Sequence, residues 1–342
     1  MTSRLIRSAA LLVALGVGCD ARTEGPAAFA DIARKKPDVT IVVTDSGLGG
    51  LSVAADLAAR LPASGIVRSA RIVFVNAEPD VAFGYNDMKH EADKVRVFDG
   101  VLAVVEARYK PDLILIACNT LSVVYPGTAH AKRGGIETVE IVGLGADLIR
   151  RELAAKPDAT DFVFATKTTI ESGAHKRLLV ETGVPPDHVV GEACPRLAGA
   201  IERGSSSEET VAYVKKFVVE ALEKKRAKGG PLVVSLNCTH YGYVKPLWEQ
   251  AFAAAGYPGV KVLDPNSLMT DLVLREGGEK RFPKTAITVE AVSKVSIDEA
   301  TRANLGSLLR TTSPETADAL AHYRHEPTLF PAAVDPAAII AR

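Results

Sequence analysis

The sequence predicts an α/β fold with two similar domains, each built on a parallel sheet flanked by helices. Short apolar segments alternate with segments of helical periodicity, as in strand–helix–strand units joined by right-handed crossovers. This alternation occurs twice along the chain, which suggests one sheet for each repeat. A length of 342 residues, 47% apolar and 24% charged, fits two globular domains better than one.

The first repeat begins after residue 38. Its third strand is apolar at nearly every position, as expected for a strand covered by helices on both faces. A glycine-rich loop follows the first strand, and glycines let a backbone approach a ligand closely. The predicted strands are 39–45, 70–77, 112–118 and 139–144, and the predicted helices are 51–61 and 90–108.

The second repeat begins at residue 161. Its predicted strands are 161–166, 188–191 and 231–238, and its predicted helices are 174–182 and 208–228. Beyond it, we expect a helix over 245–255 and strands over 260–264 and 286–292. From residue 313 the chain contains four prolines and no clear period, so we expect it to be loosely packed or wrapped over the surface.

The N-terminal residues have the layout of an export signal. Arg4 and Arg7 precede an apolar run over 9–17 that is too short to span a bilayer, and the run ends at Gly18-Cys19, which resembles a lipoprotein cleavage site. We therefore expect a signal peptide over 1–19 with a lipobox-like Cys19, and a tether over 20–38. The protein would then be exported, as a periplasmic or membrane-anchored lipoprotein. A cytoplasmic protein is the alternative.

Charge and cysteine content narrow the class of protein. Basic and acidic residues balance at 41 each, with no block of like charge, so we expect no nucleic-acid partner. A membrane would be contacted only through a lipid anchor at Cys19. With Cys19 lipidated, Cys118, Cys194 and Cys238 remain. This odd number favours reactive thiols over a disulfide framework.

Two segments share one pattern, an apolar strand that stops at a cysteine. They are DLILIACNTLS (112–122) and PLVVSLNCTHYG (231–242). Ligands of parallel sheets bind beyond the carboxyl ends of the strands, where both cysteines are expected. A single buried cysteine is more often an inert core residue, so the prediction depends on the pair. Two thiols facing each other can remove a proton from one face of a carbon acid and return one to the other face.

Polar residues beside the cysteines suit this chemistry. Asn119, Thr120 and Thr239 directly follow the cysteines at predicted helix starts, where backbone N–H groups favour a carboxylate. Asp45 ends the first strand and His240 follows Thr239, so each could orient or activate a thiol.

Five segments, in order, resemble the aspartate/glutamate racemase superfamily and, within it, glutamate racemase. They are VTDSGLGGLSV (43–53), ACNTLS (117–122), ATKTTIESGAHKRLL (165–179), EACPRLAGAIERG (192–204) and NCTHYGYVKPLW (237–248). The resemblance extends over roughly residues 39–310. It implies two flavodoxin-like halves with the active site in the cleft between them. The first domain would comprise 39–140 and 245–312, the second 141–244, and residues 313–342 a C-terminal extension.

The resemblance also implies residue roles in a racemisation of glutamate that needs no cofactor and no metal. The catalytic residues would be Cys118, Cys238, Asp45, His240 and Glu202. The residues binding the amino acid would be Ser46, Phe83, Gly84, Asn119, Thr120, Thr166, Thr169 and Thr239. Cys194 matches a cysteine that is not a base. The sequence does not fix the oligomeric state, and a homodimer is one arrangement it allows.

One loop departs from the family pattern. Within NAEPDVAFG (76–84), Ala82 stands where the family has proline, and Phe83 lacks the hydroxyl of the family's tyrosine. In the family this loop helps to hold the side-chain carboxylate of the substrate, so we expect the protein to accept amino acids beyond glutamate. Family members normally supply D-glutamate for cell-wall precursors in the cytoplasm, a role that an exported form would not serve directly.

Three alternatives stay open at this point. One is an exported amino-acid-binding lipoprotein with the racemase fold, and another is a racemase for a different amino acid. The third is a zinc site built from Cys118, Cys238 and His240, for which the sequence offers no evident fourth ligand.

Overall fold

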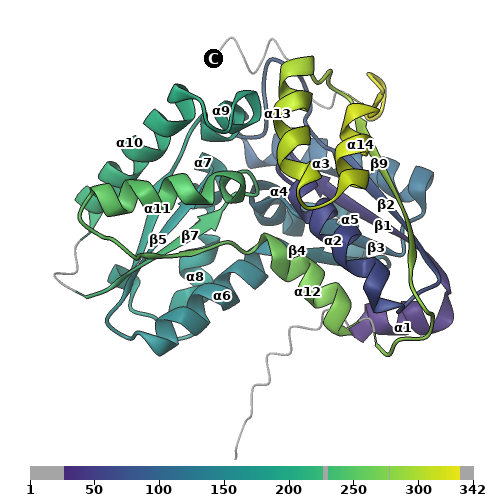
Figure 1. Cartoon of the computed structure of the whole chain (residues 1–342), viewed down its shortest axis with the longest axis horizontal. Helices are drawn as coiled ribbons and strands as arrows, with labels where there is room; N and C mark the ends of the chain where they lie inside the picture. The colour runs from purple at the N-terminus through teal and green to yellow at the C-terminus, as the bar shows by residue number, and fades with distance from the viewer. Residues whose placement is uncertain (1–26, 226–229, 277, 332–342) are drawn as a thin grey trace, which may run out of the picture.

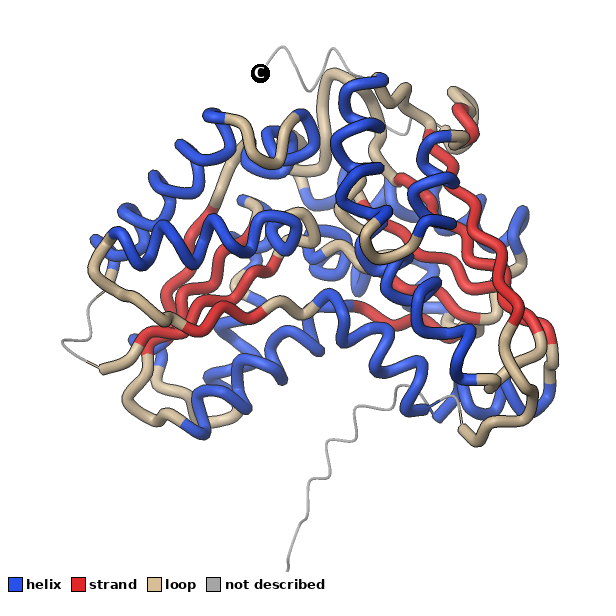
Figure 2. Tube along the Cα trace, viewed as in Figure 1, coloured by secondary structure: helices blue, strands red, loops and turns tan. Residues whose placement is uncertain are grey.

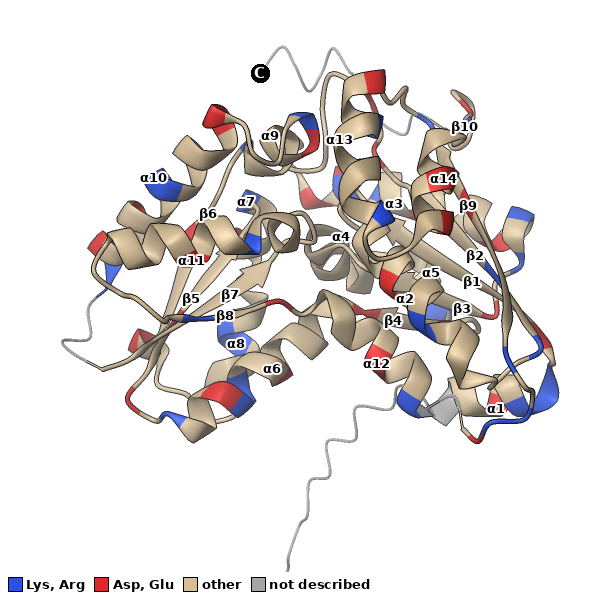
Figure 3. Ribbon diagram, viewed as in Figure 1, with Lys and Arg blue, Asp and Glu red and all other residues tan. Residues whose placement is uncertain are grey.

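The computed structural model describes residues 27–225, 230–276 and 278–331, which form two α/β domains side by side (Figure 1). Each domain is a parallel sheet with helices on both faces, as Figure 2 shows by colour. Among the described residues, no helix has the length and apolar character needed to cross a membrane. Lys and Arg are interspersed with Asp and Glu over both domains (Figure 3).

The first domain contains a six-stranded sheet in the order β10-β9-β2-β1-β3-β4. Its strands are β1 Asp38–Asp45, β2 Ser69–Asn76, β3 Leu113–Ile116, β4 Glu137–Glu140, β9 Ala286–Ser293 and β10 Arg324–His325. Its helices are α1 Ala27–Lys35, α2 Leu51–Ser64, α3 Glu91–Tyr109, α4 Asn119–Val124, α5 Ala129–Arg133, α12 Asn266–Glu276, α13 Glu299–Arg310 and α14 Pro314–Ala321.

The second domain contains a four-stranded sheet in the order β6-β5-β7-β8. Its strands are β5 Thr160–Ala165, β6 Val189–Ala193, β7 Leu232–Asn237 and β8 Lys261–Leu263. Its helices are α6 Ile141–Ala155, α7 Lys167–Ser172, α8 Ala174–Glu181, α9 Leu197–Arg203, α10 Glu208–Lys224 and α11 Lys245–Ala254. The chain returns to the first sheet after β8, so the second domain is inserted in the first.

Successive side chains of the central strands point to opposite faces of the sheet, so each sheet has a hydrophobic core on both faces. In β1, Ile41 and Val43 pack with α2 and α12, whereas Val42 packs on the opposite face with α3. The second sheet is likewise covered by α9, α10 and α11 on one face and by α6 and α8 on the other. Burial on both faces explains why the strands are apolar at successive positions.

Several predicted boundaries are wrong. The strand predicted over 139–144 ends at Glu140, because the Glu140 carboxylate accepts hydrogen bonds from the backbone N–H groups of Val142 and Gly143 and starts α6. Residues 245–263, predicted in the first domain, belong to the second, since β8 pairs with β7 and Trp248 of α11 lies in the second core.

Both ends of the described chain are more ordered than predicted. Within the predicted tether over 20–38, Phe29 and Ala33 lie one helical turn apart and bury α1 against the first core. After residue 313, α14 packs on the same core through Ala317 and Leu320, and β10 extends the sheet, so this part is not loosely packed. The predicted signal peptide over 1–19 lies outside the described residues.

Candidate active site

The carboxyl ends of the two sheets meet across the domain boundary. Asp45 ends β1, and its Oδ2 accepts a hydrogen bond from the Thr239 hydroxyl, which follows β7, at 2.7 Å. Both side chains are buried. Gly49 makes this approach possible, since a Cβ there would lie only 2.3 Å from Thr239 Oγ1. The glycine-rich loop after β1 is therefore a contact surface between the domains.

Cys118 lies on the first-domain side of this junction, as the N-cap of α4. Its sulfur lies 3.1 Å from Ser46 Oγ and accepts a hydrogen bond from the Leu121 backbone N–H at 3.4 Å. Burial, reinforced by the negative charge of Asp45, raises the pKa of the Cys118 thiol well above its usual range. Both effects therefore favour the neutral thiol form of Cys118.

Cys238 lies on the second-domain side, next to an imidazole–carboxylate pair. Its sulfur is 3.7 Å from His240 Nδ1, and His240 Nε2 lies 2.6 Å from Glu202 Oε1. Burial acts against protonation of His240, but its contacts with Cys238 and Glu202 outweigh burial and raise the pKa of the imidazole well above its usual value. A protonated His240 donates to Glu202 through Nε2 and can donate to the sulfur through Nδ1.

Glu202 also ties α9 to the first domain, because its Oε1 accepts a hydrogen bond from the Leu48 backbone N–H at 2.9 Å. One carboxylate thus holds the imidazole and the glycine-rich loop together. This arrangement fixes the position of His240 relative to the first domain.

A third carboxyl group, Glu78, lies close to this pair and was not predicted. Burial and the nearby Glu202 carboxylate raise the pKa of Glu78 to about 8. Burial also raises the pKa of Asp45, although the charge of His240 opposes that effect. Glu202 contacts the His240 imidazole, and Asp45 and Glu78 interact with it electrostatically.

The predicted substrate-binding threonines gather in a second cluster. The Thr120 hydroxyl, in the first domain, lies 2.7 Å from that of Thr166, which in turn lies 3.0 Å from that of Thr169. Asn119 is buried beside them in the chain, and neither atom of its side-chain amide has a partner. Since an unpaired buried amide is costly, Asn119 is poised to bind a ligand.

The 76–84 loop differs from expectation. The Phe83 side chain is buried in the hydrophobic cluster that also contains Cys118, so it serves packing. The Gly84 backbone N–H, predicted to bind a substrate carboxylate, instead donates to Asp87 Oδ2 at 2.8 Å. An anionic group of the protein thus occupies this donor.

Residues just beyond the loop join the two domains and were also missed. Asn86 accepts a hydrogen bond from the Thr168 backbone N–H at 3.0 Å, and Lys94 Nζ donates to the Thr168 hydroxyl at 2.7 Å. Tyr85 is buried in the Cys118 cluster. The sequence signal that could have revealed these residues is the run of polar residues directly after Gly84, in the segment that follows β2.

Cys194 has no place in this pair of thiols. Its sulfur contacts the Glu192 backbone carbonyl at 3.7 Å, and its own carbonyl accepts a hydrogen bond from the Tyr241 hydroxyl at 3.3 Å. Burial raises the pKa of the Cys194 thiol well above its usual value. Among the described residues, Cys118, Cys194 and Cys238 are all free, and no three His, Cys, Asp or Glu side chains are grouped to hold a metal ion.

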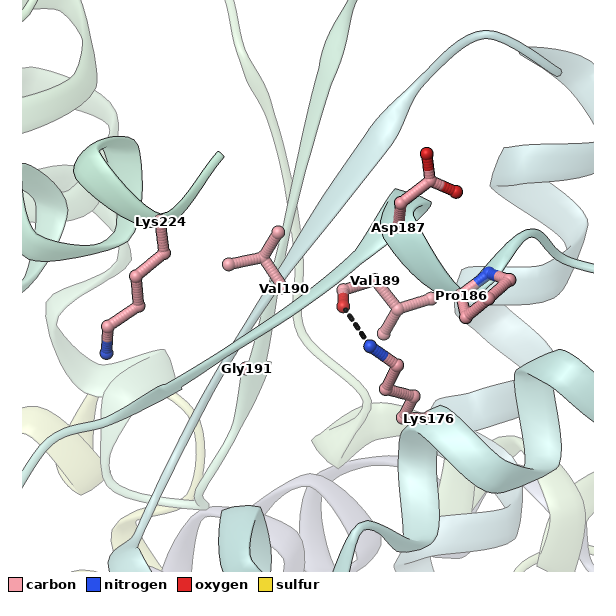
Figure 4. Close-up of a pocket in the computed structure, with 7 residues that line it drawn as sticks. All are labelled: Lys176, Pro186, Asp187, Val189, Val190, Gly191 and Lys224. Atoms are coloured by element: carbon pink, nitrogen blue, oxygen red, sulfur yellow. Dashed lines mark hydrogen bonds between the residues drawn. The ribbon is translucent and has the colours of Figure 1, made fainter. Parts of the chain in front are cut away.

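A hollow of about 510 Å³ lies elsewhere, along the edge strand β6 (Figure 4). It is lined by Lys176, Pro186, Asp187, Val189, Val190, Gly191 and Lys224. None of these residues belongs to the cysteine sites, and the Lys176 ammonium donates to the Val189 carbonyl at 3.4 Å. The hollow is therefore separate from the candidate active site.

Known proteins resemble the chain in sequence. A glutamate racemase from Lactiplantibacillus plantarum is 28% identical over 259 residues, which cover 73% of this chain and 86% of that relative. A glutamate racemase from Corynebacterium glutamicum is 30% identical over 205 residues, covering 60% of this chain and 67% of that relative. No family model matches the chain.

Solved structures share the fold. Glutamate racemase from Francisella tularensis, in complex with D-glutamate, has a TM-score of 0.60 at 20% identity and covers 81% of this chain and 95% of that one. Glutamate racemase from Thermus thermophilus, in complex with β-chloro-D-alanine, has a TM-score of 0.56 at 25% identity, covering 79% and 92%. The predicted fold class is confirmed, and the chain belongs to the aspartate/glutamate racemase superfamily, within its glutamate racemase branch, a family of isomerases.

Proposed function

We propose that the protein racemises glutamate by proton transfer at Cα between two cysteine bases, Cys118 and Cys238. The observation that carries the proposal is the position of the two thiols at facing ends of the two sheets, joined by the Asp45–Thr239 hydrogen bond. Each sulfur has its own set of polar partners, Ser46 on one side and His240 on the other. Glutamate is the proposed substrate because the relatives similar in sequence are glutamate racemases.

The two thiols start in different states. Cys118 is the proton donor, since burial and Asp45 favour its neutral form. Cys238 is the base, because the His240 imidazolium beside it can pair with a thiolate. Cys238 removes the Cα proton as its S–H bond forms, and Cys118 delivers its own proton to the opposite face and becomes a thiolate. The opposite enantiomer reacts by the reverse steps.

Charged groups of the substrate complement the site. Its ammonium group can pair with Asp45. This pairing offsets the negative charge that disfavours the Cys118 thiolate. Its α-carboxylate can accept a hydrogen bond from the unpartnered Asn119 amide. The substrate thus supplies a positive charge for Asp45 and a hydrogen-bond acceptor for Asn119.

Deuterium exchange tests the proposal. The protein is incubated with L-glutamate in heavy water, and deuterium at Cα is followed by NMR while chiral chromatography follows D-glutamate. We expect both signals to appear in the parent, and both to be absent from Asn119→Ala at low substrate concentration. Tight binding of glutamate with no exchange would instead support the amino-acid-binding lipoprotein, which the similarity to racemases does not favour.

We also propose that the protein is exported and lipidated at Cys19, with the residues before it removed. Support comes from Arg4 and Arg7, followed by the apolar run that ends at Gly18-Cys19. Mass spectrometry of the native N-terminus tests this. An intact Met1 on protein from the cytosolic fraction would contradict it.

A further inference from the structure

Tyr85 has a buried hydroxyl group without a hydrogen-bond partner. The side chain is 1% exposed, and its oxygen is among the buried polar atoms with no partner. A phenol oxygen removed from water and left unpaired destabilises the folded state unless another group uses it. The hydroxyl would be satisfied by a neighbouring group that becomes a stronger hydrogen-bond acceptor in another protonation state.

Tyr85 shares its surroundings with Cys118. Both side chains lie in the hydrophobic cluster between the first sheet and α3, which also includes Phe83 and Val97. Cys118 is the titratable group that acts on Tyr85 by charge, and together with burial it raises the pKa of the phenol well above its usual value. The phenol thus keeps its proton over the working pH range and can act only as a donor or a neutral acceptor.

The reaction gives Cys118 a state in which it needs donors. The thiolate of Cys118 would be buried, and both burial and the negative charge of Asp45 disfavour it. The donors already in place are Ser46 Oγ at 3.1 Å and the Leu121 backbone N–H at 3.4 Å. A neutral thiol, by contrast, is a weak hydrogen-bond acceptor, so it leaves the Tyr85 hydroxyl unused.

We propose that the Tyr85 hydroxyl donates a hydrogen bond to the Cys118 thiolate, and that Tyr85 is thereby a positioning residue for one of the two bases. The proposal rests on the proposed function in assigning Cys118 a thiolate state. Tyr85 stands two positions after Phe83, so a phenol hydroxyl is present just beyond the 76–84 loop, in the same cluster as Cys118.

The test is residue-specific alkylation of Cys118 in Tyr85→Phe, measured as a function of pH by peptide mass spectrometry. Removing one donor to a buried anion should slow alkylation of Cys118 about tenfold to a hundredfold at each pH. Alkylation of Cys238 in the same sample should not change. This measurement does not depend on turnover, so it can succeed even if glutamate is not the substrate.

Tyr109→Phe is the matched control. Tyr109 is buried in the same cluster, but its hydroxyl already accepts a hydrogen bond from Arg324 at 3.1 Å. We expect Tyr109→Phe to leave the Cys118 profile unchanged. Tyr85→Phe should also melt at or above the temperature of the parent, since it removes an unpaired hydroxyl.

A Cys118 alkylation profile that is identical in Tyr85→Phe and the parent would overturn the proposal. If Tyr85→Phe also had a raised KM and a constant kcat, the Tyr85 hydroxyl would be a substrate contact and not a partner of the thiol.

Discussion

Asp45 in the first domain and Thr239 in the second share a hydrogen bond of 2.7 Å between buried side chains. Asp45 ends β1 and Thr239 lies two residues after the end of β7, so this bond holds the carboxyl ends of the two sheets together. Cys118 follows β3, which neighbours β1, and Cys238 lies between β7 and Thr239. The spacing available to a substrate therefore depends on close backbone approach at the same point.

Gly49→Ala should impair turnover strongly, because the added Cβ would lie 2.3 Å from Thr239 Oγ1 and 2.6 Å from His240 Nδ1. We expect kcat/KM to fall at least about tenfold. Gly306→Ala is the matched control, since Gly306 lies in α13 with open space around it. It should leave kcat/KM unchanged and raise stability by up to about 1 kcal/mol. Equal activity in both variants would show that the domains tolerate a wider spacing.

Glu78 should make substrate binding pH-dependent. Burial and Glu202 raise its pKa to about 8, so the carboxyl group is neutral at pH 7 and becomes charged above about pH 8. Deprotonation adds a negative charge beside Glu202 and should raise the KM for anionic substrates. Glu78→Gln mimics the neutral form and should keep a low KM at high pH. If the KM still rose with pH in Glu78→Gln, the pH dependence would belong to another group.

Asp161 should lower stability at neutral pH. Its carboxyl group is fully buried, with one hydrogen bond from the Ser235 hydroxyl at 2.8 Å, and burial raises its pKa from 3.8 to about 8. The folded protein then binds more protons than the unfolded chain between these values. Asp161 therefore reduces the unfolding free energy as pH rises across that interval, by up to about 1.4 kcal/mol per pH unit.

The isosteric Asp161→Asn tests this effect by urea unfolding at several pH values. The variant should match the parent near pH 4 and become progressively more stable than it towards pH 8. A stability difference that does not vary with pH would mean that Asp161 keeps its charge in the folded protein.

Substrate choice should depend on Asp87. The Asp87 carboxylate accepts a hydrogen bond from the Gly84 backbone N–H. The side-chain carboxylate of a substrate must therefore displace Asp87 or bind elsewhere. We expect the parent to turn over glutamine or aspartate as slow substrates besides glutamate. Asp87→Ala should improve kcat/KM for glutamate relative to glutamine, by about tenfold, because a hydrogen bond to a charged group becomes available. A panel of L-amino acids with chiral chromatography measures this. An unchanged ratio would mean that Gly84 does not contact the substrate.

Local patterns in the sequence were sufficient to predict most strands, because β1, β3 and β7 are buried on both faces and are largely apolar. They also marked the strand ends that carry Asp45, Cys118 and Cys238. The short β4 was misplaced because Glu140 starts a helix inside an apolar run, which composition does not reveal. Membership of α11 and β8 in the second domain depends on long-range pairing, which periodicity does not encode.

The missed site residues have a similar explanation. Glu78 and Tyr85 acquire their roles only through burial near residues that are distant in the sequence, namely Glu202 and Cys118. Asp87 and Gly84 are close in sequence, but their hydrogen bond requires the particular turn that follows β2. A loop of mixed polar residues offers no periodicity from which such contacts could be inferred.

The most direct test of the two-base mechanism is racemisation by Cys118→Ala and Cys238→Ala, each compared with Cys194→Ala. Each of the first two changes removes the acid or base for one face of Cα, so we expect neither variant to form D-glutamate from L-glutamate above background. Cys194 shares a core cluster with Cys238, but its sulfur contacts the Glu192 carbonyl, so Cys194→Ala should retain racemase activity. Racemisation at the parental rate by either Cys118→Ala or Cys238→Ala would contradict the two-cysteine account.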